Sequence, residues 1–376
     1  MTKPEFKLES FRYSKEEIDR LLVWGHESGA SDFQFLPNEA PWMRLFGEWY
    51  RPCSTLMSAS DIKDFLNQSS RAPSSAAQVE SGNDVDYAYE IKVDRATRLR
   101  FRANATGCRD GWEIGAAMVL RTIPSTPPRL EDLNVEQGIW DAIMPAYGLV
   151  LVTGPVGSGK TTLLAATLRS ILENQPRNVL TYEAPIEFDL VGISPRKGAI
   201  VQTEIPSALR EFGRAPRNSL RRAGDVVLFG ESRDKETIRD MTIVAETGVA
   251  VYTTVHTNSV SETISRMVRE FPYEERDGMS ATLLSSIRLI VHQRLLRTVD
   301  GKRVAVREFL PFDDSTRNSL YSVPNSQLIP EIHRMVEQKG QTLMTAIERE
   351  YSKGVISKEV HAQMAAILAA SKPEGV

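Results

Sequence analysis

The residues from Gly154 to Thr161 read Gly-Pro-Val-Gly-Ser-Gly-Lys-Thr, a glycine-rich run that ends in a lysine and a hydroxyl. In such a run backbone N–H groups curve around phosphate oxygens, the lysine reaches the β- and γ-phosphates, and the hydroxyl binds Mg²⁺. An apolar segment, 149–153, precedes the run and a helix-like segment, 161–173, follows it, which is the context that phosphate binding requires. We therefore predict an ATP and Mg²⁺ site. Its predicted nucleotide contacts are Gly154, Pro155, Val156, Gly157, Ser158, Gly159, Lys160, Thr161 and Thr162, with Thr161 also a magnesium ligand.

Two acidic segments follow apolar runs that have the length of buried strands. Glu231 comes after 225–229, and Glu183 and Glu187 come after 179–182. The carboxyl ends of parallel strands converge on the ligand crevice of an α/β sheet, so these acids belong at the phosphate site. ATP hydrolysis needs a carboxylate that positions magnesium and a group that orients water. We expect Glu183 to activate the water and Glu231 to act through magnesium, although the two roles are interchangeable on sequence grounds.

His256 ends a further apolar run, 249–254. There an imidazole N–H is placed to contact the γ-phosphate and to sense its loss. The competing interpretation is a structural histidine. No second His, Cys or acid lies at metal-ligand spacing from His256, which excludes a zinc interpretation.

The elements that must position these residues fall into two patterns. Apolar and helical segments alternate from residue 149 to 254, which predicts an α/β domain with a mostly parallel sheet. The first 120 residues instead show a helix after Ser14 and strand-like alternation at 32–35, 43–49, 87–93, 98–104 and 115–120, which predicts a small α+β domain with an antiparallel sheet. We expect an exposed loop at 69–82, a proline-rich connection near 123–128, and C-terminal helices at 343–350 and 358–368.

Composition limits the function classes. The chain has 376 residues, a net charge of −3 and only two cysteines, Cys53 and Cys108. These values predict a folded protein of two or more domains, without a disulfide framework, and give no global field for binding nucleic acid. The sequence has no apolar run long enough to span a bilayer, and the first eleven residues lack the apolar segment of a secretory signal. We expect a cytoplasmic protein.

Four ordered segments resemble the motif boxes of one family: 154–162, 181–187, 224–234 and 248–259. They are similar to the Walker A, Asp, Walker B and His boxes of the traffic ATPases of type II and type IV secretion and pilus retraction, the PilT/DotB-like family. The resemblance implies a PAS-like N-terminal domain over 1–121, a linker over 122–135, a RecA-like ATPase domain over 136–326 and a C-terminal helical segment over 327–376. It also implies a homohexamer with ATP held between the first two domains.

The family resemblance further implies that arginines complete the site. Arg102, Arg109 and Arg121 match the candidates of the N-terminal domain, and Arg217 and Arg221 match those before Walker B. Guanidinium groups would neutralise charge that develops on the transferred phosphoryl group. Arg121 is the preferred catalytic arginine. Any of the five can instead form a surface ion pair.

Three departures from the family pattern indicate the type of secretion or pilus machine in which we expect the protein to work. Ala184 stands where the Asp box commonly has Asp, Gln34 where retraction ATPases usually have His, and Thr203 where an arginine often follows the glutamine. These differences favour a DotB-like component of a type IVB secretion system or a related conjugative system, with pilus retraction as the alternative. An alternative from another functional class is a RecA-like nucleic-acid motor. Such a motor would bind nucleic acid through the arginines at 210–222, but acidic residues border these arginines. We expect the protein to be recruited to the cytoplasmic face of the inner membrane through secretion-system components, among them another secretion ATPase, with no direct nucleic-acid partner.

Overall fold

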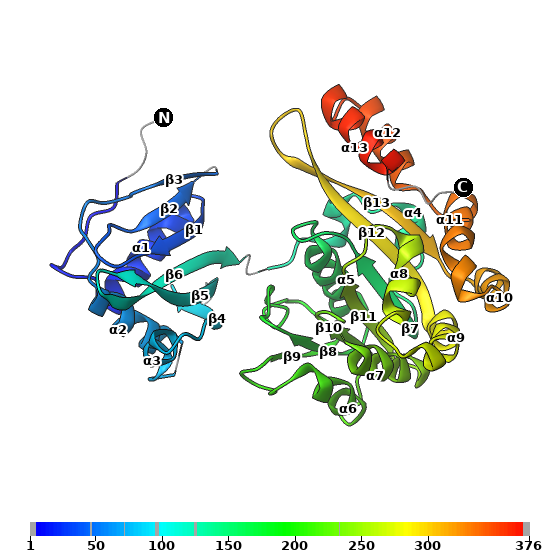
Figure 1. Ribbon diagram of the computed structural model, residues 1–376, viewed down its shortest axis with the longest axis horizontal. Coiled ribbons are helices and arrows are strands. Elements are labelled where there is room, and N and C mark those ends of the chain that lie inside the picture. The colour runs from blue at the N-terminus through cyan, green and yellow to red at the C-terminus, as the bar shows by residue number, and fades with distance from the viewer. Residues whose placement is uncertain are drawn as a thin grey trace. The chain divides into compact units, whose positions relative to one another are not determined.

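A computed structural model of the chain describes residues 5–45, 47–70, 72–94, 98–123, 126–232 and 234–370. The chain forms two compact units, residues 1–125 and 126–376 (Figure 1). Of the predicted linker, positions 124 and 125 lie outside the described residues, as does Arg233 of the predicted Walker B segment. Residues 126–135 belong to the second unit. There Leu130 is fully buried in a short 3-10 helix, Leu130–Leu133.

The first unit contains one antiparallel sheet, in the order β3-β2-β1-β6-β5-β4. The predicted strand segments are confirmed, with one refinement. Segment 43–49 contains parts of two strands, β2 and β3, joined by a turn in which Gly47 has a φ of 89°. A positive φ favours glycine, so the residue permits the chain to reverse there. The strands are β1 Ala30–Phe35, β2 Trp42–Leu45, β3 Glu48–Tyr50, β4 Val85–Lys92, β5 Arg98–Asp110 and β6 Glu113–Ile123.

Three helices cover the sheet of the first unit: α1 Lys15–Glu27, α2 Ala59–Ser69 and α3 Ser75–Glu80. The expectation of an exposed loop at 69–82 is wrong for α3. Ala76 and Val79 are buried in the core of this unit, and the Asn67 side chain accepts a hydrogen bond from the N–H of Ala76 at 2.9 Å. Burial and this side-chain cap stabilise a helix that the Ser- and Ala-rich composition does not announce.

The second unit is built on a seven-stranded sheet in the order β13-β12-β7-β11-β10-β8-β9. All neighbours are parallel except β12 and β13, which form an antiparallel hairpin at one edge. The four predicted strands of this domain are confirmed as β7, β8, β10 and β11. The strands are β7 Gly148–Thr153, β8 Asn178–Glu183, β9 Ala199–Glu204, β10 Val226–Phe229, β11 Ala250–Val255, β12 Ile287–Arg297 and β13 Arg303–Pro311.

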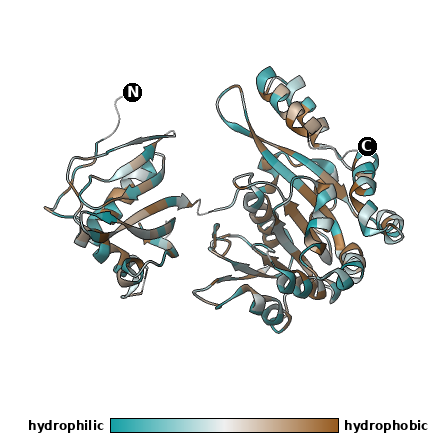
Figure 2. Ribbon diagram, in the orientation of Figure 1, coloured by the Kyte–Doolittle hydropathy of each residue, from teal (hydrophilic) through white to brown (hydrophobic). Residues whose placement is uncertain are grey.

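Both faces of this sheet are buried. Along β7, Leu149 and Leu151 belong to one apolar cluster, and Val150 and Val152 belong to another on the opposite face. Such two-sided burial explains why these strands are continuous apolar runs in the sequence, and they are correspondingly hydrophobic in Figure 2.

Helices cover the two faces. The predicted helix 161–173 is confirmed as α5, and the C-terminal segments 343–350 and 358–368 are confirmed as parts of α12 and α13. Helix α12 packs against β13 (Figure 1). No helix within the described ranges has the length and apolar composition needed to cross a bilayer. The helices are α4 Gln137–Trp140, α5 Lys160–Asn174, α6 Ala215–Leu220, α7 Lys235–Glu246, α8 Val260–Val268, α9 Arg276–Ser286, α10 Asp314–Tyr321, α11 Leu328–Lys339, α12 Leu343–Ser352 and α13 Lys358–Ala370.

Candidate active site

The glycine-rich loop leaves the buried end of β7 and enters α5 at Lys160. Gly154, Gly157 and Gly159 have φ values of 140°, 75° and 82°, which L side chains rarely adopt. At Gly154 a Cβ would lie 2.3 Å from the carbonyl oxygen of Gln293, so only glycine fits against β12. The loop tip is open, with Val156 exposed. The result is a backbone cradle at a helix N-terminus, where N–H groups lack intrahelical partners.

Lys160 lies folded over this loop. Its Nζ donates hydrogen bonds to the carbonyl oxygens of Gly154 and Pro155 at 2.8 and 2.9 Å. Burial lowers the pKa of the amine, and the charges of Glu187 and Glu231 partly oppose that effect. These interactions bring Lys160 and Glu231, two predicted site residues, into one electrostatic environment. An ammonium held in a low-dielectric pocket among carbonyl oxygens is suited to exchange them for phosphate oxygens.

Ser158 supplies a second sign of a ligand. Its side chain is almost fully buried, and its Oγ has no hydrogen-bond partner within the described part of the chain. A buried hydroxyl without a partner is costly, whereas a bound oxyanion would accept a hydrogen bond from it. Together with the glycine cradle, this hydroxyl fits a phosphate group.

The two predicted acids lie at the ends of neighbouring parallel strands. Glu183 ends β8, and Glu231 follows β10 by two residues. Gly230 connects them, because its N–H donates to the carbonyl of Tyr182 at 2.8 Å and its Cα faces the backbone of Glu183. The Glu183 side chain is buried, and its Oε1 accepts hydrogen bonds from Thr181 Oγ1 at 2.6 Å and from Gln202 Nε2 at 3.3 Å.

The neighbouring edge strand, β9, fixes the acidic loop after β8. Gln202 donates to the carbonyl of Phe188 at 2.9 Å and accepts from the N–H of Leu190 at 2.8 Å. Glu204 accepts from the N–H of Ile186 at 3.2 Å. Gln202 and Glu204, which flank the departure at Thr203, therefore hold the segment that follows Glu183.

His256 follows β11 and is exposed. It lines a cavity of about 370 Å³ that Glu231, Arg266 and Glu270 also line. The structure thus brings His256 and Glu231 to one cavity, at the end of the sheet that carries the phosphate loop. The described residues contain no group of three or more His, Cys, Asp or Glu that could hold a metal ion.

Three of the predicted arginines lie in the first unit. Arg121 on β6 donates from Nε to Asp32 Oδ1 at 2.7 Å, and it stands opposite Arg102 on β5 in the strand register. Arg121 and Arg102 are both exposed, whereas Asp32 is buried. Arg109, near the turn between β5 and β6, donates to the carbonyl of Gly111 at 3.3 Å. Arg102 and Arg121 therefore share one face of the sheet.

The remaining two arginines lie in the second unit. Arg217 is on the short helix α6 and Arg221 follows its end, and both side chains are exposed. Nearby, Tyr182 Oη donates to Asn218 Oδ1 at 2.8 Å, which joins α6 to the strand that carries Glu183. The helix is thus attached to the acidic edge of the sheet, with its arginines on the solvent side.

The edge strand β13 carries buried charges on both faces. Arg307 faces the phosphate loop, through Gln293 on β12. Glu308 faces the opposite side, where its Oε1 accepts from the N–H of Val260 at the start of α8. Burial raises the pKa of the Glu308 carboxyl. Beside it on β12, His292 contacts Thr153 Oγ1 at 3.2 Å, and burial, with Arg294 and Lys160, lowers its pKa to about 3.

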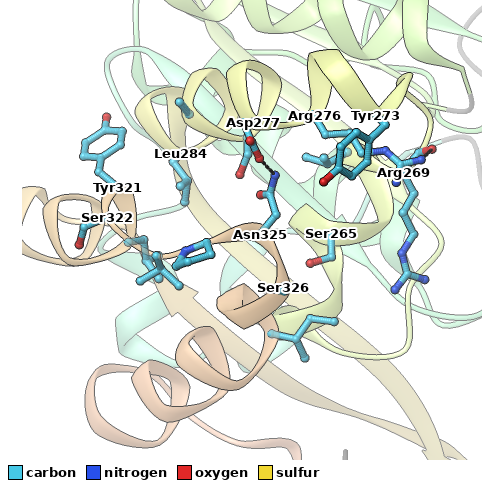
Figure 3. Close-up of a pocket in the computed structure, with 17 residues that line it drawn as sticks. Ser265, Arg269, Tyr273, Arg276, Asp277, Leu284, Tyr321, Ser322, Asn325 and Ser326 are labelled. Atoms are coloured by element: carbon cyan, nitrogen blue, oxygen red, sulfur yellow. Dashed lines mark hydrogen bonds between the residues drawn. The ribbon is translucent and has the colours of Figure 1, made fainter.

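A separate cavity of about 650 Å³ lies among α8, α9, α10 and the segment before α11 (Figure 3). Asp277 Oδ1 accepts a 2.6 Å hydrogen bond from Asn325 Nδ2 across it, and Arg269 and Tyr273 stand on its rim. None of the predicted site residues lines this cavity.

Sequence reasoning missed Gln202, Gln293 and Arg307, which lie on β9, β12 and β13, three strands that it did not identify. A signal for the β12–β13 hairpin was available, since Asp300-Gly301 stands between two segments rich in β-branched and apolar residues, and Gly301 has a φ of 81°.

Comparison with known proteins gives consistent matches. The family described as Type II/IV secretion system protein matches residues 95–348. The chain is 33% identical over 348 residues to the type IV pilus retraction ATPase PilT of Pseudomonas aeruginosa, which covers 91% of this chain and 96% of that protein. The X-ray structure of the Legionella pneumophila ATPase DotB matches with a TM-score of 0.83 and 37% identity, over 96% of this chain and 98% of that one.

A crystal structure of the pilus retraction motor PilT with bound ADP matches with a TM-score of 0.80 and 26% identity, over 96% of this chain and 98% of that chain. These structures confirm the expected fold class: a RecA-like α/β domain with a parallel sheet, preceded by a smaller PAS-like α+β domain and followed by C-terminal helices.

Proposed function

Because the chain belongs to the family of type II/IV secretion system proteins and is an ATPase, we propose that it works as a hexameric motor of a type IVB protein secretion system. The observation that carries this choice of machine is the likeness to the Legionella pneumophila ATPase DotB, at 37% identity over nearly the whole of both chains. Pilus retraction is the second candidate, supported by 33% identity to PilT over a similar span. Membership in this family favours both over a nucleic-acid motor.

In the proposed reaction, the loop from Gly154 to Thr162 binds the phosphates of ATP. Lys160 exchanges its contacts with the carbonyls of Gly154 and Pro155 for contacts with phosphate oxygens. Thr161 and Glu231 would hold Mg²⁺, which would neutralise phosphate charge. Two protein ligands suit this ion, because Mg²⁺ commonly keeps several waters and takes its other oxygens from the phosphates.

We assign the water-activating role to Glu183. Its carboxylate is buried and oriented by two donors, so it can take a proton from an in-line water with little reorganisation. His256 would sense the γ-phosphate. Arg121, assisted by Arg102 and Arg109 of the N-terminal unit and by Arg217 and Arg221, would stabilise charge on the transferred phosphoryl group.

The proposed assembly is a homohexamer that reaches the cytoplasmic face of the inner membrane through secretion-system components, including another secretion ATPase. No direct contact with nucleic acid is part of the proposal.

The first test is steady-state ATPase activity and solution mass, with and without nucleotide, for the wild type, Lys160→Ala and Glu231→Gln. We expect turnover to be lost in both variants, and a hexamer in the wild type that nucleotide strengthens. A wild type that binds ATP, stays monomeric and hydrolyses nothing would refute the motor proposal.

A second test separates the two machines. In the bacterium that encodes the chain, the gene is deleted and replaced by wild type or by Lys160→Ala. Translocation of a reporter-tagged secretion substrate should be lost with the deletion and restored only by the wild type. If secretion is normal and surface pili instead accumulate without retracting, the retraction function replaces the secretion function.

A further inference from the structure

Gln293 on β12 forms part of the floor beneath the phosphate loop. Its Nε2 donates a 2.6 Å hydrogen bond to the carbonyl of Ser158, and this contact is buried. The same Nε2 would lie 2.9 Å from a Cβ at Gly159, and its backbone carbonyl closes on Gly154. One residue of a neighbouring strand therefore touches both ends of the loop and binds the Ser158 carbonyl.

Arg307 on β13 holds Gln293 in place. The two residues are register partners, and Arg307 Nε donates to Gln293 Oε1 at 2.7 Å. This bond fixes the amide so that its N–H group points at Ser158. The Arg307 side chain is 2% exposed, and burial lowers its pKa. A guanidinium buried this deeply requires a matching anion and acceptors for its other N–H groups.

Glu136, just before α4, supplies that anion. Its Oε2 accepts a hydrogen bond from Nη1 of Arg307 at 3.1 Å, which forms an ion pair. The carbonyls of Leu133 and Asn134 accept two more bonds from the guanidinium, at 3.0 and 3.2 Å. The Arg307 guanidinium thus donates to four acceptors, on Gln293, Glu136, Leu133 and Asn134. These bonds leave it little freedom to move independently of the loop.

The contacts continue into the C-terminal helices. Arg349 on α12 donates from Nη2 to Glu136 Oε1 at 2.7 Å, so Glu136 bridges two arginines. Gln341, just before α12, accepts from Arg349 Nη1 at 3.0 Å and donates to the carbonyl of Arg307 at 2.8 Å. A continuous set of hydrogen bonds therefore runs from Ser158 to α12.

We propose that Gln293, Arg307 and Glu136 are positioning residues that hold the phosphate loop in its nucleotide-binding shape, and that Arg349 makes this shape depend on the position of helix α12. This inference rests on the proposed role of the loop in binding ATP. It gives the C-terminal helices a means of adjusting nucleotide affinity, because any shift of Arg349 changes the partners of Glu136 and, through Arg307, those of Gln293.

Two substitutions at Gln293 distinguish positioning from simple packing. Gln293→Met has similar volume but loses both the donor and the acceptor. Gln293→Glu keeps the acceptor for Arg307, loses the donor to Ser158 and sets a carboxylate oxygen against the Ser158 carbonyl. We expect the KM for ATP and the Kd for ADP to rise about three- to tenfold in both, the range expected for losing one or two hydrogen bonds. The Tm should fall mainly in Gln293→Met. A residue that only packs would lower Tm without moving KM.

Arg349→Ala tests the extension to α12 in a variant expected to fold, because this side chain is 36% exposed. Arg334→Ala is the matched control, since Arg334 on α11 also pairs with a glutamate on the same unit but has no contact with Glu136. We expect the KM for ATP to rise in Arg349→Ala with kcat changed less, and both to be unchanged in Arg334→Ala.

The double variant Gln293→Glu/Arg349→Ala supplies the decisive measurement. If both residues act through one network, their effects on the Kd for ADP are less than additive, whereas independent sites add. Full additivity, or a Kd unchanged in Arg349→Ala, overturns the proposal. If the wild type binds no nucleotide, the proposed ATP site itself is wrong. If the wild type binds nucleotide and Lys160→Ala does not, the ATP site stands and only the network proposal is at stake.

Discussion

Thr181 donates a 2.6 Å hydrogen bond to the carboxylate of Glu183, two residues further along the same strand. Because alternate residues of a strand share a face, β8 itself supplies the donor that orients its terminal acid. The orientation of the acid is therefore set by the sheet and not by a mobile loop. A base held in this way is arranged before substrate arrives.

Glu183→Gln should lower kcat for ATP hydrolysis by about 10² or more, the usual size of a general-base contribution, and leave nucleotide binding nearly unchanged. Glu231→Gln should instead weaken magnesium binding, so that the turnover it loses at ordinary Mg²⁺ is partly regained as the Mg²⁺ concentration is raised. Turnover at graded Mg²⁺, with binding followed by a fluorescent ADP analogue, measures both. The reverse pattern would exchange the roles of the two acids.

Gln202→Ala should lower kcat by roughly tenfold with a smaller change in KM, because it removes a donor to Glu183 and two contacts that hold residues 188–190. Ser207→Ala, after the same strand, is the control, because among the described residues its hydroxyl donates to Glu204 alone and not to Glu183 or to residues 188–190. Equal kcat values for Gln202→Ala and the wild type would show that β9 does not position the base.

Arg121→Ala should reduce kcat by about 10³ if this arginine acts on the transferred phosphoryl group. The Tm should also fall, because Asp32, whose side chain is only 6% exposed, loses its ion-pair partner, although Arg121 itself is 67% exposed. Arg98→Ala is the control, since Arg98 lies on the same sheet and pairs with Glu90. Activity and Tm are measured for both variants on the assembled protein. Equal activities of Arg121→Ala and Arg98→Ala would refute the role of Arg121.

Acid should destabilise the second unit through His292. Burial lowers its pKa to about 3 from the ordinary 6.5, so at lower pH the unfolded chain binds a proton that the folded chain does not. The free energy of unfolding is unaffected by this group above about pH 6.5. It falls as pH drops toward 3, by at most about 1.4 kcal/mol per pH unit.

His292→Asn should remove this dependence while keeping a polar group beside Thr153. Urea unfolding at pH 7 and at pH 5 should show a loss in the wild type that is about 2 kcal/mol larger than in the variant. An equal loss in both proteins would place the acid sensitivity elsewhere, for example among the ion pairs of the surface.

The sequence predicted the parts of the site that local rules determine. Gly154 to Thr161 requires a strand before it and a helix after it, and both are present. The family resemblance inferred from four ordered segments is confirmed as well. Glu183 and Glu231 were placed near each other because parallel strands align their carboxyl ends.

Contacts between segments distant in sequence were not predictable in this way. Gln293 is 135 residues from Ser158, and Arg349 is 213 residues from Glu136. Neither pair follows a local periodicity. Helix α3 was missed for a related reason, because the burial of Ala76 and Val79 against the sheet, and not local composition, stabilises it.

Strand β13 places opposite charges back to back. Arg307 serves the face of the phosphate loop, and the next residue, Glu308, accepts the N–H of Val260 on the other face, directly after the segment that carries His256. A slip of one residue in the β12–β13 register would interchange the two faces, setting the Glu308 carboxylate beside Glu136 and the Arg307 guanidinium against a helix N-terminus. Both juxtapositions are repulsive, so Arg307 and Glu308 together specify the register of the hairpin by destabilising the misaligned pairing during folding.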